Sequence, residues 1–143
     1  MKGGNIHEFI RKASVKNIPI FPTQVVEGTL FSSLNLPESL KATITRHGYT
    51  NLTPIQAQGI PAIRAGKDVI GIANTGTGKT ATFLIPLVEN ILKNYSYQAL
   101  IISPTRELAL QTRDELRKFS GNMAIFSAFC IGQSSMRDQT YEL

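Results

Sequence analysis

DVIGIANTGTGKT, residues 68–80, carries the clearest structural signals in this sequence. Three of the four residues at 69–72 are apolar and β-branched, as in a buried strand, and Gly76 and Gly78 follow. Glycine permits the positive φ angles that bring successive backbone N–H groups toward an anion. A helix is expected to begin at Lys79. The stretch therefore predicts a strand, a phosphate-binding loop and a helix, in that order.

The residues around the start of this helix suit a bound polyphosphate. Helix N-terminal N–H groups attract anions, Lys79 brings an ammonium group to the β- and γ-phosphates, and the Thr80 hydroxyl is suited to Mg²⁺. Alanine replaces the first glycine of the strict motif, and a simple glycine-rich turn with an exposed lysine is the alternative. We expect phosphate or Mg²⁺ contacts from Ala73, Asn74, Thr75, Gly76, Thr77, Gly78, Lys79 and Thr80, with catalytic roles for the last two.

Composition bounds the class of protein. With 143 residues, 42% hydrophobic and 17% charged, the chain is long enough for one globular domain. It has no apolar run long enough to span a bilayer, and its start lacks a secretory signal. One cysteine and two isolated histidines provide neither a disulfide framework nor a metal cluster. We expect a cytoplasmic protein, with the nucleus as a second possible location.

The net charge of +5 lies in the first half of the chain. Residues 1–67 carry eight Lys and Arg against three Asp and Glu, whereas residues 68–143 carry seven of each. This asymmetry mildly favours an anionic partner, although a solvated basic leading segment explains it equally well.

Two helices are expected before the loop. Pro37 is a good first helical residue, apolar residues recur at i, i+4 and i+8 behind it, and Gly48 supplies the stop, which predicts about ten helical residues. A second helix should begin at Pro54. Gly59 and Pro61 are expected to split it into short turns.

Alternating strands and helices follow the loop. Apolar residues at i, i+3, i+4, i+7 and i+8 predict a helix over 79–93 with one buried face. Residues 99–103 are predicted as the next buried strand, Thr105 as the N-cap of another helix, and residues 123–131 as a third strand. This order is typical of βαβ units, so we predict an α/β fold with a parallel sheet and flanking helices.

A second motif is GYTNLTPIQ, residues 48–56, with Phe31 lying 17 residues before Gly48. One interpretation is a capping box, in which Thr53 and Gln56 satisfy the first N–H groups of a helix. The functional interpretation is that the Gln56 amide, both donor and acceptor, pairs with the adenine edge while Phe31 stacks on the base.

The third motif, PTRELA at residues 104–109, places a cation where a strand ends and a helix begins. Helix N-terminal N–H groups together with Arg106 suit a phosphate of a nucleic-acid backbone. Alternatively, Thr105 is only an N-cap and Glu107 only a favourable first-turn acid.

These three motifs resemble the Q motif, motif I and motif Ia of the DEAD-box ATP-dependent RNA helicases, in the family's order and spacing. The resemblance covers residues 29–143 and implies a RecA-like domain that is incomplete at its C-terminal side. It implies ATP and Mg²⁺ at residues 73–80, Phe31 and Gln56 on adenine, and Thr105 and Arg106 on RNA. The chain then divides into an extension (1–28), a Q-motif segment (29–57) and a partial ATP-binding domain (58–143).

The chain departs from the family pattern in two ways. It reads Ile131-Gly132-Gln133 where a double glycine is usual, and the D-E-A-D motif and second domain are not in the sequence. Glu115 is expected to be solvated rather than catalytic. We therefore expect an RNA helicase whose first 143 residues do not hydrolyse ATP alone. The alternatives are a nucleotide- or RNA-binding module that never hydrolyses ATP, and a P-loop ATPase acting on DNA or protein.

Overall fold

Four α-helices joined by extended segments make up the described part of the chain, which in this computed structural model is residues 28–132. The predicted extension lies outside the described residues except for Gly28. In chain order the elements are a short 3-10 helix η2 (Phe31–Ser33), α1 (Glu38–Arg46), α2 (Pro54–Arg64), α3 (Lys79–Lys93) and α4 (Arg106–Ser120).

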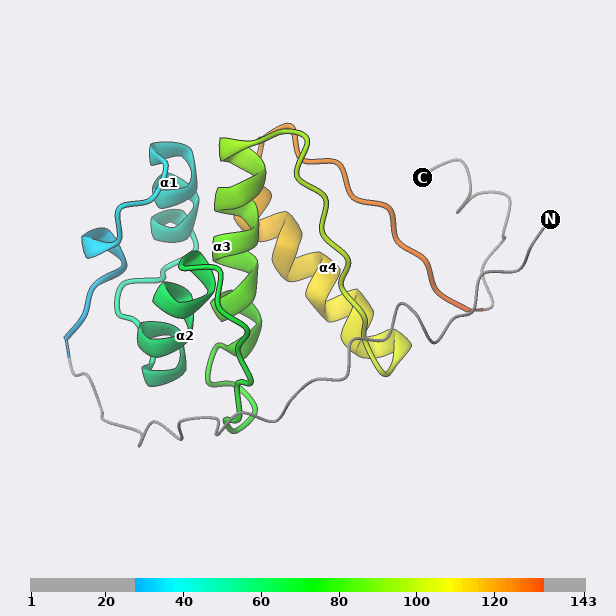
Figure 1. Cartoon of the computed structure of the whole chain (residues 1–143), viewed down its shortest axis with the longest axis horizontal. Helices are drawn as coiled ribbons and strands as arrows, with labels where there is room; N and C mark the ends of the chain where they lie inside the picture. The colour runs from blue at the N-terminus through cyan, green and yellow to red at the C-terminus, as the bar shows by residue number, and fades with distance from the viewer. Residues whose placement is uncertain (1–27, 133–143) are drawn as a thin grey trace.

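The helices pack around α3 (Figure 1). Helix α3 contacts α2 on one side and α4 on the other, and α1 contacts α4 and η2. The N-terminal ends of α3 and α4 both lie toward the lower side of Figure 1. No helix within residues 28–132 is long and apolar enough to cross a membrane. The core is formed by Phe31, Leu36, Leu40, Ile44, Leu52, Ile60, Ala81, Leu84, Ile85, Val88 and Phe119.

Three of the predicted helices are confirmed. Helix α1 occupies nine residues after Pro37, and α3 has the predicted bounds of 79–93. Helix α4 begins after Thr105, whose hydroxyl oxygen accepts a hydrogen bond from the Leu108 N–H at 3.2 Å, as an N-cap does. In α1 and α3 the apolar stripe faces the core, because burying one face is the main source of helix stability in a protein. In α4 Phe119 and Leu116 face the core, whereas Leu108 is 40% exposed.

The prediction that Gly59 and Pro61 split the second helix is wrong, because α2 runs unbroken from Pro54 to Arg64. Pro61 lacks only the N–H that would reach the Ala57 carbonyl, and the Ala65 N–H still bonds the Pro61 carbonyl at 3.0 Å. Gly59 serves packing, since a Cβ there would collide with the Thr82 Cγ2 of α3. Close contact between α2 and α3 therefore outweighs the low helix propensity of both residues.

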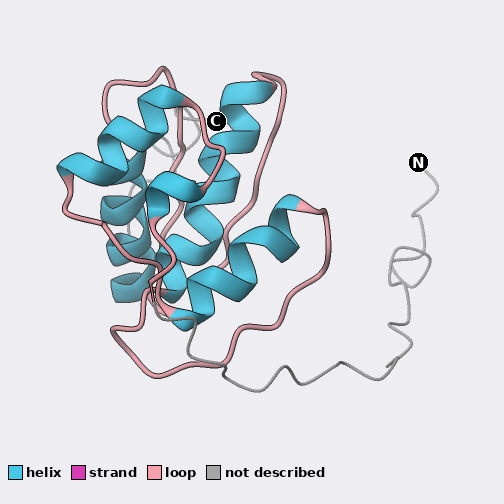
Figure 2. Cartoon of the chain, turned by 90° about the vertical axis from the view of Figure 1, so that its left-hand side faces the viewer, coloured by secondary structure: helices cyan, strands magenta, loops and turns pink. Residues whose placement is uncertain are grey.

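The three predicted strands are extended in the structure but have no ladder of hydrogen bonds (Figure 2). Within residues 28–132 the sole β-pairing is an isolated antiparallel bridge between Leu30 and Asn51. The prediction that these segments are buried is wrong here, because Ile72 is 90% exposed and Phe126 is 96% exposed. A strand needs a neighbouring strand to satisfy its backbone, and residues 28–132 do not pair these three segments with one another.

Candidate nucleotide-binding site

The glycine-rich loop lies directly before α3, as predicted. Gly76 and Gly78 have φ angles of 79° and 84°, in the left-handed region that favours glycine, and Gly78 is the N-cap of α3. The Thr77 hydroxyl donates to the Asn74 carbonyl at 2.8 Å and tightens the turn. The loop therefore brings its backbone to the positive end of a 15-residue helix, where an anion is favoured.

Lys79 turns its side chain back over this loop. Its ammonium group donates to the carbonyls of Ala73 at 2.5 Å and Asn74 at 2.6 Å. The ammonium thus lies beside the loop, near the first-turn N–H groups of α3, which have no partner within the helix itself. Thr80, in the same turn, is half-buried. This donor set fits a polyphosphate, and the Thr80 hydroxyl supplies an oxygen of the kind that Mg²⁺ prefers.

Gln56 joins the start of α2 to the phosphate loop. Its side chain is almost completely buried, with 1% exposed. The amide oxygen accepts from the Thr53 N–H at 2.9 Å, and the amide nitrogen donates to the Gly78 carbonyl at 3.3 Å. The Thr53 hydroxyl also donates to the Thr77 carbonyl at 2.8 Å. The predicted capping box is therefore present, and the same two residues fix the loop.

The two hydrogen bonds to the loop were not foreseen from the sequence. Capping boxes are recognised from local spacing, whereas Gln56 and Gly78 are 22 residues apart. The Gly78 carbonyl also accepts from the Thr82 N–H at 3.1 Å and hydroxyl at 3.0 Å. A Cβ at Gly78 would collide with the Gln56 amide nitrogen. Position 78 therefore requires glycine for two reasons: its φ angle is positive, and the Gln56 amide leaves no room for a Cβ atom.

Phe31 is placed in the core. Its side chain is 3% exposed, and its ring meets the Tyr49 ring edge to face, with centroids 5.8 Å apart and an interplanar angle of 81°. Tyr49 in turn packs against Phe119 of α4, with centroids 5.4 Å apart. The structure thus gives Phe31 a packing role beside the Q-motif segment. Stacking of Phe31 on adenine stays a prediction.

Tyr49 fastens the Q-motif segment to α4. Its hydroxyl donates to the Glu115 carboxylate at 2.5 Å, and the carboxylate also pairs with Lys118 at 3.0 Å. Burial, followed by the hydrogen bond and the negative charge of Glu115, raises the pKa of Tyr49 to about 12. The prediction that Glu115 is simply solvated is therefore wrong, because its side chain is 19% exposed and bonded to a residue 66 positions away.

The third predicted group lies at the start of α4. Thr105 is the N-cap and Arg106 the first helical residue, and both are exposed. The start of α4 lies toward the same lower side of Figure 1 as the start of α3. Among residues 28–132, no three or more His, Cys, Asp or Glu side chains gather as a metal site. Contact of Thr105 and Arg106 with RNA stays a prediction.

Comparison with protein families shows that residues 53–143 match the model of the DEAD/DEAH box helicases. The chain is 48% identical over 114 residues to the ATP-dependent RNA helicase CshA of Limosilactobacillus reuteri, covering 79% of this chain and 23% of that relative. It is 39% identical over 127 residues to the DEAD-box ATP-dependent RNA helicase RhpA of Helicobacter pylori strain B128, covering 86% and 26%. The chain thus spans about a quarter of the length of these relatives.

Solved structures give the same result. A DEAD box protein from the hyperthermophile Methanococcus jannaschii superposes with a TM-score of 0.75 at 36% sequence identity, over 82% of this chain and 33% of that one. The RNA helicase Prp28 from Chaetomium thermophilum, bound to ADP, gives a TM-score of 0.66 at 40% identity, over 74% and 27%. The predicted fold class, α/β and RecA-like, is therefore confirmed by these neighbours, although the sheet is not formed within residues 28–132.

Proposed function

This chain belongs to the DEAD/DEAH box helicase family, and from that premise we propose that it forms the front part of the ATP-binding domain of an ATP-dependent RNA helicase. The observation that carries the proposal is the phosphate loop at the start of α3. Lys79 lies over this loop, and Gln56 bonds to its last carbonyl. The whole protein would use ATP to remodel RNA duplexes or ribonucleoprotein.

In this proposal Lys79 transfers its hydrogen bonds from the carbonyls of Ala73 and Asn74 to the β- and γ-phosphates. The N–H groups of the first turn of α3 hold the same phosphates, and Thr80 contributes a hydroxyl oxygen to Mg²⁺. When bound, the metal ion neutralises charge that develops on the phosphates during their transfer. Lys79 and Thr80 would therefore orient the phosphates, and groups outside these 143 residues would carry the remaining steps.

Gln56 has unused hydrogen-bonding groups for adenine, although its side chain is only 1% exposed and would have to become accessible to the base. Its amide uses one oxygen lone pair for Thr53 and one N–H for Gly78. A carboxamide has two donors and two lone pairs, so one of each remains for the adenine edge. In this proposal Phe31 leaves its core contact with Tyr49 far enough to stack on the base.

Arg106 and Thr105 are proposed to contact an RNA phosphate at the start of α4. An exposed guanidinium beside helix N–H groups binds phosphate without reading the base, so the RNA partner would be recognised by its backbone. A cytoplasmic location belongs to the same proposal and rests on the sequence alone.

Replacing Lys79 with alanine tests the phosphate site. We expect Lys79→Ala to lower the affinity of the 143-residue chain for ATP·Mg²⁺ by about tenfold or more, because a charge-assisted hydrogen bond is worth about 1.5–3 kcal/mol. In a full-length protein the variant should abolish ATP-dependent activity. The measurement is equilibrium titration with a fluorescent ATP analogue. Lys41→Ala, which removes an ammonium paired with Glu38 on α1, is the matched control. Equal affinity in wild type and Lys79→Ala would contradict the assignment.

Replacing Gln56 tests base recognition separately from the phosphate site. Gln56→Ala should bring the affinities for ATP and GTP together, while the lost cap lowers the free energy of unfolding by about 1 kcal/mol. Both quantities are measured on one preparation, by nucleotide titration and by urea unfolding. A variant that is less stable but keeps the ATP preference of the wild type shows that Gln56 acts only as a structural cap.

A further inference from the structure

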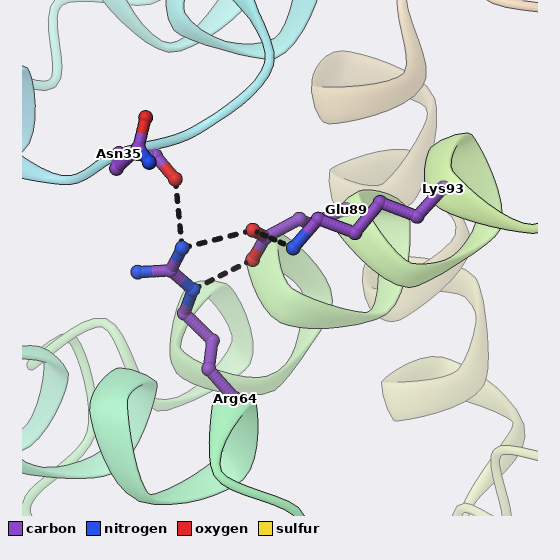
Figure 3. A network of polar contacts seen from close by, with 4 residues as sticks. All are labelled: Asn35, Arg64, Glu89 and Lys93. Atoms are coloured by element: carbon purple, nitrogen blue, oxygen red, sulfur yellow. Dashed lines mark hydrogen bonds and ion pairs between the residues drawn. The ribbon is translucent and has the colours of Figure 1, made fainter.

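A second polar network lies at the opposite end of α2 from Gln56 (Figure 3). Arg64, the last residue of α2, faces Glu89 of α3 with a two-pronged contact: Nη2 to Oε1 at 2.9 Å and Nε to Oε2 at 2.8 Å. Lys93 adds a third contact to Oε1 at 2.7 Å. The same Nη2 of Arg64 donates to the Asn35 carbonyl at 2.7 Å. One guanidinium thus joins three segments of the chain.

The burial of this network is uneven. The Glu89 side chain is 1% exposed, Arg64 is 27% exposed and Lys93 is 60% exposed. A buried carboxylate is tolerated only when its charge is paired, so Glu89 depends on the guanidinium staying in place. Arg64 donates one hydrogen bond to Oε1 and faces Oε2 as an ion pair, while Oε2 itself accepts no hydrogen bond. The guanidinium also reaches the Asn35 carbonyl, and a single ammonium group cannot reproduce all of these contacts. The pair therefore specifies a single arrangement of α2 against α3.

Helix α2 is consequently fastened to α3 at both of its ends. At the N-terminal end the bond from the Gln56 amide to the Gly78 carbonyl is 3.3 Å long, at the weak limit for a hydrogen bond. At the C-terminal end is the Arg64–Glu89 pair, about 12 Å away along α2 at 1.5 Å per residue. Between them Gly59 lets the helices approach closely at Thr82. Because the bond at Gln56 is long, a small slide or rotation of α2 would break it.

The hydrogen bond from Arg64 to the Asn35 carbonyl links the same network to the segment that contains Phe31. Asn35 lies in the connection from η2 to α1, four residues after Phe31. The guanidinium that fixes α2 to α3 therefore also fixes the segment that carries the proposed base-stacking ring. Both parts of the proposed base site, Phe31 and Gln56, depend on elements that Arg64 and Glu89 hold together, and so does the hydrogen bond from Gln56 to the Gly78 carbonyl.

We propose that Arg64 and Glu89 are positioning residues for base recognition: they set the register of α2 on α3 and so hold Gln56 in place to distinguish adenine from other bases. This inference rests on the proposed nucleotide site. Neither residue lies at the phosphate loop, so they act through Gln56 rather than on the nucleotide. A purely structural ion pair would lower stability alone, whereas a positioning pair also lowers base selectivity.

The test uses the 143-residue chain and the variants Glu89→Gln and Arg64→Lys. Glu89→Gln keeps the shape of the side chain and removes its charge, whereas Arg64→Lys keeps the charge and removes the two-pronged contact. If Glu89→Gln fails to fold, Arg64→Lys still tests the inference. Arg64 is partly exposed, so its replacement disturbs the fold less than a change at the buried Glu89. We expect the ratio of ATP to GTP affinity to fall by about tenfold in Glu89→Gln and by less in Arg64→Lys. Affinity for inorganic triphosphate should stay within about twofold.

Two controls separate positioning from stability. Val88→Ala removes a fully buried apolar side chain next to Glu89 on the same helix and should lower stability without changing base selectivity. A second readout needs no nucleotide: the Gln56 side-chain amide protons, followed by NMR, should exchange faster in Glu89→Gln than in Val88→Ala.

The outcomes are distinct. If both network variants keep the wild-type ATP preference and the protection of the Gln56 amide, Arg64 and Glu89 only stabilise the fold and the inference is wrong. If Val88→Ala lowers selectivity as much as Glu89→Gln does, it is also wrong. Should the wild type bind no nucleotide, the proposed function fails, and exchange at the Gln56 amide alone decides whether the network positions this residue.

Discussion

Helix α3 and the extended segments of this chain both carry runs of apolar residues, but their surroundings are opposite. Leu84, Ile85 and Val88 of α3 are completely buried. By contrast, Ile70 is 70% exposed and Ile72 is 90% exposed, although both lie in the segment that leads into the phosphate loop. Residues 100–102 repeat this contrast, with Leu100 85% and Ile102 84% exposed. Apolar sequence alone therefore does not determine burial.

The difference lies in where each segment finds its hydrogen-bond partners. A helix satisfies its backbone within itself, so α1 to α4 need only an apolar face to pack against. A strand takes every partner from another segment. An unpaired apolar strand is an edge that favours association with other chains. The helices are thus specified locally, whereas the segments at 69–72, 99–103 and 123–131 need a ladder with neighbouring strands that residues 28–132 do not form.

The largest effect that tests this contrast is in hydrogen exchange. Amides in the middle of α3 should exchange about a thousandfold or more slowly than those of residues 69–72 and 100–102, because exchange in core helices is limited by unfolding. The measurement is exchange of the 143-residue chain in deuterium, with its monomeric state checked by sedimentation. Strong protection of residues 69–72 in a monomer would show that this segment is a paired strand, and the contrast with the helices would be wrong.

Two phenylalanines provide a matched pair for stability. Phe119 of α4 is completely buried and its ring packs against Tyr49, whereas Phe126 lies in an extended segment and is 96% exposed. Phe119→Ala should lower the free energy of unfolding by about 3–5 kcal/mol, whereas Phe126→Ala should change it by less than about 0.5 kcal/mol. Chemical unfolding of both variants measures the difference. Similar losses in the two would show that residue 126 is buried in solution.

The smallest expected effect is on the packing of the helices, at the hydrogen bond from the Tyr49 hydroxyl to Glu115 of α4. The pKa of Tyr49 is raised from 10.0 to about 12 in the folded chain. Its contribution to stability is therefore complete below pH 10 and is lost as the pH rises through 12, because the unfolded chain releases the proton first. Tyr49→Phe should lose about 1 kcal/mol at pH 7. It should also show a shallower loss of stability than wild type between pH 10 and 12.

The comparison at alkaline pH sets Tyr49→Phe against wild type, because the two proteins differ only in the Tyr49 hydroxyl. Parallel stability curves for wild type and Tyr49→Phe between pH 10 and 12 would mean that the hydroxyl is not bonded to Glu115. Thermal unfolding in a series of buffers is sufficient for this measurement.

Local signals predicted the helices well. The periodicity of α3, the N-cap at Thr105 and the capping box at Thr53 each depend on residues within one or two turns, and each is found in the structure. The unbroken course of α2 through Gly59 and Pro61 could not be predicted in this way. It depends on contact with Thr82 of α3, which is remote in sequence.

The candidate site shows the same limit. The glycine-rich loop and the helix that follows it were predicted from glycine chemistry and the helix start, and the structure has both. Phosphate binding by these residues stays a prediction. The bond from Gln56 to the Gly78 carbonyl and the hydroxyl of Tyr49 on Glu115 join motifs across long stretches of chain. No spacing rule predicts such contacts, because they depend on how the helices pack.

The side chain of Lys79 has a consequence for how strongly any phosphate can be held. Its ammonium group already has two acceptors in its own loop, the carbonyls of Ala73 and Asn74. An incoming phosphate must therefore compete with these internal acceptors rather than meet an idle cation. The dissociation constant for phosphate therefore depends on a difference in free energy, between the bonds of Lys79 to the phosphate and its bonds to the two loop carbonyls. The carbonyls compete with the phosphate for the same ammonium group. Loosening the turn at Asn74 should thus tighten phosphate binding without adding a single new contact to the ligand.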